Sequence, residues 1–116
     1  MRHNLIILRT PDIERLRDFY ARLLQVTFTR HTDHGPEHYA APLKGLTIEI
    51  YPTKRRLEQL DGQGFSVLNL ETILARVDKT ALHQAPFETP VGRSAMIKDP
   101  DGRLIYLTEE KQGEQP

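Results

Sequence analysis

The sequence contains no cysteine, has no net charge and has no long hydrophobic segment, and each absence excludes a class of protein. Without cysteine there can be no disulfide, no thiolate nucleophile and no cysteine-ligated metal site. Sixteen basic and sixteen acidic side chains cancel, whereas a nucleic-acid-binding protein usually concentrates basic residues on one face. No apolar run is long enough to cross a bilayer, and no signal-peptide pattern is found at the start. We therefore expect a cytoplasmic protein that binds neither nucleic acid nor membrane.

The most informative feature that is present is an internal repeat. The segments 42–51 (PLKGLTIEIY) and 99–108 (DPDGRLIYLT) look like the same turn followed by the same strand, 57 residues apart. Gly45 and Gly102 stand at this offset, as do Ile48 and Ile105. Two copies are too few for a solenoid, but they can form a pseudo-symmetric domain with a cleft between its halves.

Hydrophobic periodicity predicts the order β-α-β-β-β in each copy. In the first copy, Thr10 and Pro11 are expected to begin a helix over 11–24. Strands are expected there at 3–9, 25–30, 37–41 and 46–51. In the second copy, Asn69 is expected to cap a helix, and strands are expected at 65–68, 85–89, 94–98 and 103–108.

The expected fold class is therefore α+β, with two tandem βαβββ modules that form a pseudo-symmetric, curled mixed sheet around a cleft. The chain 1–116 would be a single domain, in which 1–53 is the first module and 61–108 the second. Residues 54–60, which include the basic cluster Lys54-Arg55-Arg56, would be a solvated linker. The tail 109–116 is too polar to pack.

Alternation assigns the two faces of the strands, because successive side chains of a strand point to opposite sides. Ile48 and Ile50 should pack on the helix, and Ile105 and Leu107 should do the same in the second copy. The opposite faces would line the cleft and bind a small organic ligand. Their candidate ligand-binding residues are Leu5, Ile7, Arg9, Tyr51 and Tyr106. Arg9 would offer a positive charge there or reach solvent, and Tyr106 would form a wall of the cleft or close it.

Three motifs resemble one family. They are PDIERLRDFYARLL after the first strand, GPEHYAA followed by LTIEIYP, and the closing DPDGRLIYL. They resemble the vicinal oxygen chelate superfamily of glyoxalase I, extradiol dioxygenases and bleomycin-resistance proteins, over nearly the whole chain. The resemblance implies the glyoxalase/bleomycin-resistance fold and a homodimer.

The resemblance also implies four metal-ligand positions, which fall on Leu5, Glu49, Gly62 and Tyr106. Only Glu49 can bind a divalent ion in the usual way, and such an ion needs about three protein ligands of histidine or carboxylate type. We therefore expect no metal centre in the usual arrangement and no cofactor. The alternative is a shifted site for Zn, Ni, Fe or Mn, made by His3, His38 and Glu49.

His38 and Glu49 are also candidate catalytic residues. If Leu43 and Lys44 form a two-residue hairpin turn, His38 lies opposite Glu49. A carboxylate beside an imidazole suits a general base, although such pairs also occur only to satisfy polar groups on a sheet. His31 and His34 flank a turn and are expected in a solvated loop.

Two functions from different classes follow. The first is a metal-independent protein that binds a small molecule, as the bleomycin-resistance members do. The second is a lyase, isomerase or dioxygenase that uses a shifted metal or the pair of His38 and Glu49 as base. A stable scaffold without a ligand is a third, and a cleft filled by Tyr106 and Leu5 would favour it.

Overall fold

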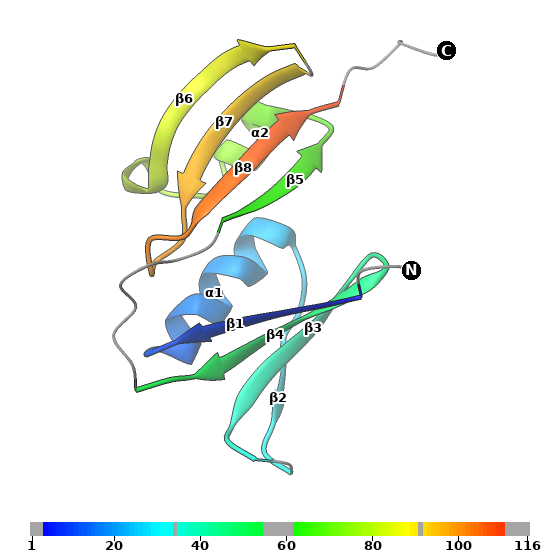
Figure 1. Cartoon of the computed structure of the whole chain (residues 1–116), viewed down its shortest axis with the longest axis vertical. Coiled ribbons are helices and arrows are strands. Elements are labelled where there is room, and N and C mark those ends of the chain that lie inside the picture. Colours follow the sequence, from blue (N-terminus) through cyan, green and yellow to red (C-terminus); the bar gives the residue numbers. More distant parts are fainter. Residues whose placement is uncertain (1–3, 34, 55–61, 91, 111–116) are drawn as a thin grey trace. The chain divides into compact units, whose positions relative to one another are not determined.

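The computed structural model of the chain describes residues 4–33, 35–54, 62–90 and 92–110. The chain divides into two compact units, Met1–Glu58 and Gln59–Pro116, here called module one and module two. Each has one four-stranded sheet (Figure 1). His3, His34 and nearly all of the expected linker and tail lie outside the described residues.

Module one has the predicted order of elements. It contains the following helix and strands: β1 (Leu5–Thr10), α1 (Ile13–Leu24), β2 (Thr29–His31), β3 (His38–Leu43) and β4 (Leu46–Pro52). The strand order in the sheet is β1-β4-β3-β2. β1 pairs with β4 in parallel, and the other pairs are antiparallel. A parallel pair needs a crossover connection, and α1 begins the one that leads from β1 to β4.

The helix α1 covers one face of this sheet, as the alternation predicts. Its side chains Leu16, Tyr20 and Leu23 are buried, and so are Ile48 and Ile50 of β4. The expected cap was wrong by two residues. Asp12 is the N-cap, and its Oδ1 accepts a hydrogen bond from the Arg15 N–H at 3.0 Å, because an aspartate carboxylate reaches the free N–H groups of the first turn.

Module two repeats this plan. It contains β5 (Gln63–Val67), α2 (Leu70–Leu74), the 3₁₀ turn η1 (Lys79–Ala81), β6 (Leu82–Thr89), β7 (Gly92–Lys98) and β8 (Leu104–Glu109). The strand order β5-β8-β7-β6 matches that of module one. Ile7 pairs with Glu49 in module one, and Gly64 pairs with Tyr106 in module two. Both members of the pair are shifted by 57 residues, so the internal repeat of the sequence is confirmed by the strand register.

Asn69 caps α2 as predicted, with Oδ1 accepting a hydrogen bond from the Thr72 N–H at 3.0 Å. The end of module two differs from the expectation. Glu109, which was placed in the polar tail, is the last residue of β8, and its Oε2 accepts a hydrogen bond from the Leu70 N–H at 2.8 Å. The carboxylate thus satisfies an amide of the first turn of α2 that has no partner within the helix. This contact keeps the charged residue in the strand.

The predicted fold class is confirmed in its two βαβββ modules, each with a mixed sheet. No helix in the described part of the chain is long and apolar enough to span a bilayer. The cleft between the modules and the homodimer stay predictions.

Candidate functional site

The candidate site lies on the face of the module one sheet that α1 does not cover. Strand pairing arranges its side chains in rows across the sheet. One row consists of His31, His38, Tyr51 and Arg9. The next row consists of Thr29, Ala40, Glu49 and Ile7. Ile7 is 43% exposed and Leu5 is 41% exposed, which agrees with their predicted place on the uncovered face.

The first row is a stack of flat groups. The rings of His38 and Tyr51 are parallel within 7°, with centroids 4.2 Å apart. The His31 ring continues the stack at 5.4 Å from the His38 ring, with an interplanar angle of 20°. At the other end, the Arg9 guanidinium carbon lies 5.9 Å from the Tyr51 ring centroid. Adjacent strands are about 4.8 Å apart, so neighbouring rings meet face to face without leaving their strands.

The predicted partner of His38 was wrong. The hairpin turn consists of Lys44 and Gly45, which makes Leu43 the partner of Leu46 and Ala40 the partner of Glu49. Gly45 has φ +83°, a conformation that glycine adopts without the steric cost of a Cβ atom. The glycine must therefore stand inside the turn. This moves the register by two residues and brings His38 beside Tyr51.

His38 is held in one orientation. It is 7% exposed, and its Nδ1–H donates to the carbonyl oxygen of Pro36 at 3.1 Å. Because a carbonyl oxygen can only accept, Nδ1 must carry the proton, and Nε2 of the neutral ring is then an acceptor. The wall that His38 and Tyr51 form is thus preorganised by a hydrogen bond as well as by stacking.

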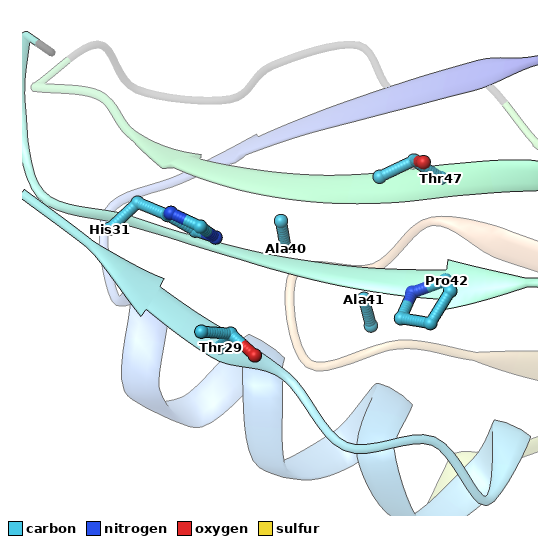
Figure 2. Close-up of a pocket in the computed structure, with 6 residues that line it drawn as sticks. All are labelled: Thr29, His31, Ala40, Ala41, Pro42 and Thr47. Atoms are coloured by element: carbon cyan, nitrogen blue, oxygen red, sulfur yellow. The ribbon is translucent and has the colours of Figure 1, made fainter.

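A hollow of about 260 Å³ lies next to this row. It is lined by Thr29, His31, Ala40, Ala41, Pro42 and Thr47. Figure 2 shows Ala40 and Pro42 on β3, between Thr29 of β2 and Thr47 of β4. The hollow exists because short side chains occupy the middle strand, where larger ones would fill the face.

Glu49 lies directly beside the hollow. It is the strand partner of Ala40 and stands two residues after Thr47 on the same face. The side chain is half-buried, and no hydrogen bond or ion pair joins it to another residue in the described ranges. Burial of a carboxylate removes part of its hydration, and this costs free energy unless a hydrogen bond or an ion pair replaces the lost water. Glu49 is thus an acidic side chain that borders the hollow without being one of its lining residues.

In module two, the corresponding face has a different construction. The Tyr106 side chain lies over Gly62, so that a Cβ atom at position 62 would be 3.2 Å from Tyr106 Cε2 and 3.2 Å from the Leu104 carbonyl oxygen. A metal-ligating side chain at position 62 would therefore be accommodated only if the Tyr106 ring shifted. Tyr106 remains 44% exposed.

The four positions implied by the family do not fit a divalent ion. Leu5 and Gly62 have no donor atom, and Tyr106 covers the place of the missing side chain. The shifted site is no better supported, because His38 faces Tyr51 instead of Glu49 and His3 lies outside the described residues. Within the described ranges, no three histidine, aspartate or glutamate side chains are grouped closely enough to hold an ion.

Sequence reasoning missed His31 and the small residues of the hollow. His31 was expected in a loop, but it is the last residue of β2 and stacks on His38. Its alternation with Thr29 was the available signal, although a three-residue strand is too short for periodicity to stand out. Ala40 and Pro42 carry no chemical signal of their own. They matter only because larger neighbours surround them.

Several solved structures share this fold. An antibiotic-binding protein of Streptomyces sp. CB03234, TnmS3, is 21% identical, with a TM-score of 0.77, and 96% of this chain aligns with 98% of that one. The bleomycin resistance determinant encoded on the transposon Tn5 is 18% identical, with a TM-score of 0.66 and coverages of 96% and 99%. The oxidase ChaP-H2 is 18% identical, with a TM-score of 0.66 and coverages of 97% and 96%.

At these identities the structures establish the fold alone. No curated protein matches the chain in sequence. A sequence model of one family matches residues 2–107, nearly the whole chain. The chain therefore belongs to the glyoxalase/bleomycin resistance protein/dioxygenase superfamily.

Proposed function

We propose that this chain is a small-molecule-binding protein of its superfamily that works without the usual divalent metal centre. One observation carries the proposal. The Tyr106 side chain lies over Gly62, so of these two family metal-ligand positions one has no side chain and the other holds a tyrosine packed against it. Leu5 at a third position has no donor atom, and one remaining carboxylate is too few ligands for a catalytic ion.

The helix-free face of module one supports binding. Ligand sites combine apolar and aromatic walls with a small number of placed polar groups. Here His31, the end of the stacked row with His38 and Tyr51, lines the hollow, and Glu49 is the polar group that borders it. The similarity in fold to an antibiotic-binding protein and to a bleomycin resistance determinant agrees with this proposal.

The alternative is a metal-dependent enzyme of the same superfamily, and Glu49 is the residue that favours this alternative. A carboxylate stands at one family position and has no partner among the described side chains. The fold is also shared by an oxidase. A base made by His38 and Glu49 loses its support, because the two residues are not opposite each other.

The homodimer and the cytoplasmic location stay predictions. Light scattering, which gives the molar mass in solution, would test the homodimer.

Metal analysis separates the two proposals. Protein purified without a histidine tag is incubated with Mn, Fe, Ni or Zn, freed of excess ion and analysed for metal per chain. We expect far less than one ion per chain, and the same trace amount in Glu49→Gln. About one ion per chain or per dimer in the wild type, lost in Glu49→Gln, would overturn the metal-free proposal. The proposed binding of small molecules is tested separately, by ligand-observed NMR with a panel of aromatic fragments. If no fragment of the panel binds, the small-molecule-binding proposal is overturned.

A further inference from the structure

We infer that the hollow on module one takes a flat ring with a cationic substituent of the amidine class, which pairs with Glu49. The inference rests on the proposed binding function and adds the charge and shape of the ligand to it. Three features support it: the size of the hollow, the shape of its walls and the charge of Glu49 beside it.

The size of the hollow sets the size of the group. The hollow has a volume of about 260 Å³ and is a shallow depression that is widely open to solvent. Pockets that enclose whole drug-sized ligands are usually larger. The hollow therefore suits one ring of a ligand.

The walls favour a flat and partly apolar group. Ala40 and Pro42 provide a short apolar surface, and His31 closes one side of it (Figure 2). The imidazole of His31 is already aligned with the stacked rings of His38 and Tyr51. A flat ring can fill this space without the entropy cost of freezing rotatable bonds.

The charge at the hollow is negative. Apart from histidine, Glu49 is the one ionisable side chain among the described residues that line the hollow or pair with a lining residue. The positive Arg9 is on β1, outside the three strands that line the hollow, and its guanidinium lies near the Tyr51 ring. Glu49 has no partner among the described side chains, and its carboxylate would gain a charged hydrogen bond when a cation binds. An anion would instead meet an uncompensated like charge.

Three probes of one shape test the inference. Benzamidine is cationic, benzamide is neutral and benzoate is anionic, and all three have the same flat ring. They are titrated into the ¹⁵N-labelled full chain, and amide shifts of Thr29, Ala40, Thr47 and Glu49 are followed. We expect benzamidine to move these signals with the lowest Kd, benzamide to bind more weakly and benzoate to leave them unchanged.

Two variants and a matched control identify the site. Glu49→Gln should weaken benzamidine roughly tenfold, the loss of about one charged hydrogen bond, and should leave benzamide unchanged. Glu14→Gln is the matched control, because Glu14 is exposed in the first turn of α1, and its benzamidine affinity should equal that of the wild type. Ala40→Leu should fill the hollow and abolish binding of every probe, with a folded spectrum as its control.

The outcomes distinguish this inference from the proposed function. Preference for benzoate, or equal affinity for the three probes, would overturn the charge assignment and leave small-molecule binding intact. Benzamidine binding that Glu49→Gln does not change would overturn the role of Glu49. If no probe binds here but other fragments of the panel bind elsewhere, the inference fails and the proposed function survives. If nothing in the panel binds at all, both fail.

Discussion

The imidazole of His38 stacks on the phenol of Tyr51, with centroids 4.2 Å apart and planes within 7°. The pair joins β3 to β4 across the helix-free face and forms the centre of a row that runs from His31 to Arg9. His38 is also tied to Pro36 by its Nδ1–H. The row is thus both a structural element of module one and the wall of its candidate site.

The stack should contribute measurably to stability. His38→Ala removes a buried ring, its aromatic contact and its hydrogen bond, and we expect it to lower the free energy of unfolding by about 1 to 3 kcal/mol. His83→Ala is the control, since His83 is exposed on β6, and it should change stability by less than about 0.5 kcal/mol. Urea unfolding followed by circular dichroism measures both.

A double-mutant cycle isolates the stacking energy itself. The variants are His38→Ala, Tyr51→Leu and their combination. Aromatic pairs contribute about 0.5 to 1.5 kcal/mol beyond their burial, so the combined loss should fall short of the sum of the single losses by about that amount. Fully additive losses would contradict an energetic role for the stack.

Tyr106 and Gly62 should be coupled in module two. Gly62→Ala brings a Cβ atom to 3.2 Å from Tyr106 Cε2 and from the Leu104 carbonyl oxygen, and we expect a loss of about 1 kcal/mol from the overpacking. Gly64→Ala, two residues later and inside β5, is the matched control, because its Cβ would meet Tyr106 at an ordinary 3.8 Å. Part of the Gly62→Ala loss should disappear in a Tyr106→Ala background. Equal losses at positions 62 and 64 would contradict the arrangement.

Asp99 should be the most sensitive residue of the closing turn. Its side chain is 0% exposed, its Oδ1 accepts from the Asp101 and Arg103 N–H groups at 2.9 and 3.0 Å, and its Oδ2 pairs with Arg103 Nη1 at 3.1 Å. Asp99→Ala removes one of the two carboxylates that pair with the Arg103 guanidinium. The guanidinium is only 8% exposed, so water cannot replace the lost carboxylate fully. We expect Asp99→Ala to cost about 3 kcal/mol.

Urea unfolding again provides the measurement for Asp99→Ala. Asp78→Ala is a suitable comparison, because Asp78 precedes η1 without a side-chain capping bond, and we expect almost no change there. A loss at Asp99 as small as that at Asp78 would show that the buried ion pair is not important for the turn.

Glu71 should give stability a defined pH dependence. Its side-chain hydrogen bond with Arg93, which joins α2 to β7, lowers the pKa of Glu71 below the ordinary 4.5. Because the folded pKa is the lower one, the contribution is fully present above the ordinary value and is lost as the pH falls through the folded pKa. Wild type should exceed Glu71→Gln in urea midpoint at neutral pH, and the difference should shrink below pH 4.5.

Arg93→Gln is the reciprocal variant for this ion pair. It removes the cation that lowers the Glu71 pKa, so Glu71→Gln should have little effect in its background at any pH. A pH-independent difference between wild type and Glu71→Gln would contradict the assignment.

The order of residue types is enough to define the modules and the faces of their strands. The 57-residue offset is visible in the residues, and the register of β1 with β4 and of β5 with β8 repeats it. Alternation placed Ile48 and Ile50 in the core and Leu5 and Ile7 outside it. The side-chain chemistry of Leu5 and Gly62 already excluded metal ligands at these positions. These properties are local, since they depend on residue type and on a period of two.

Which side chains are in contact depends on the folded arrangement of the strands. A register shift of two residues keeps every side chain on its face and changes all its partners, so alternation could not tell whether His38 meets Glu49 or Tyr51. The positive φ of Gly45 decided it. The hollow over Ala40 and the position of Tyr106 over Gly62 likewise depend on neighbours that are distant in sequence. Volume and contact belong to sets of side chains in space, and no single position of the sequence encodes them.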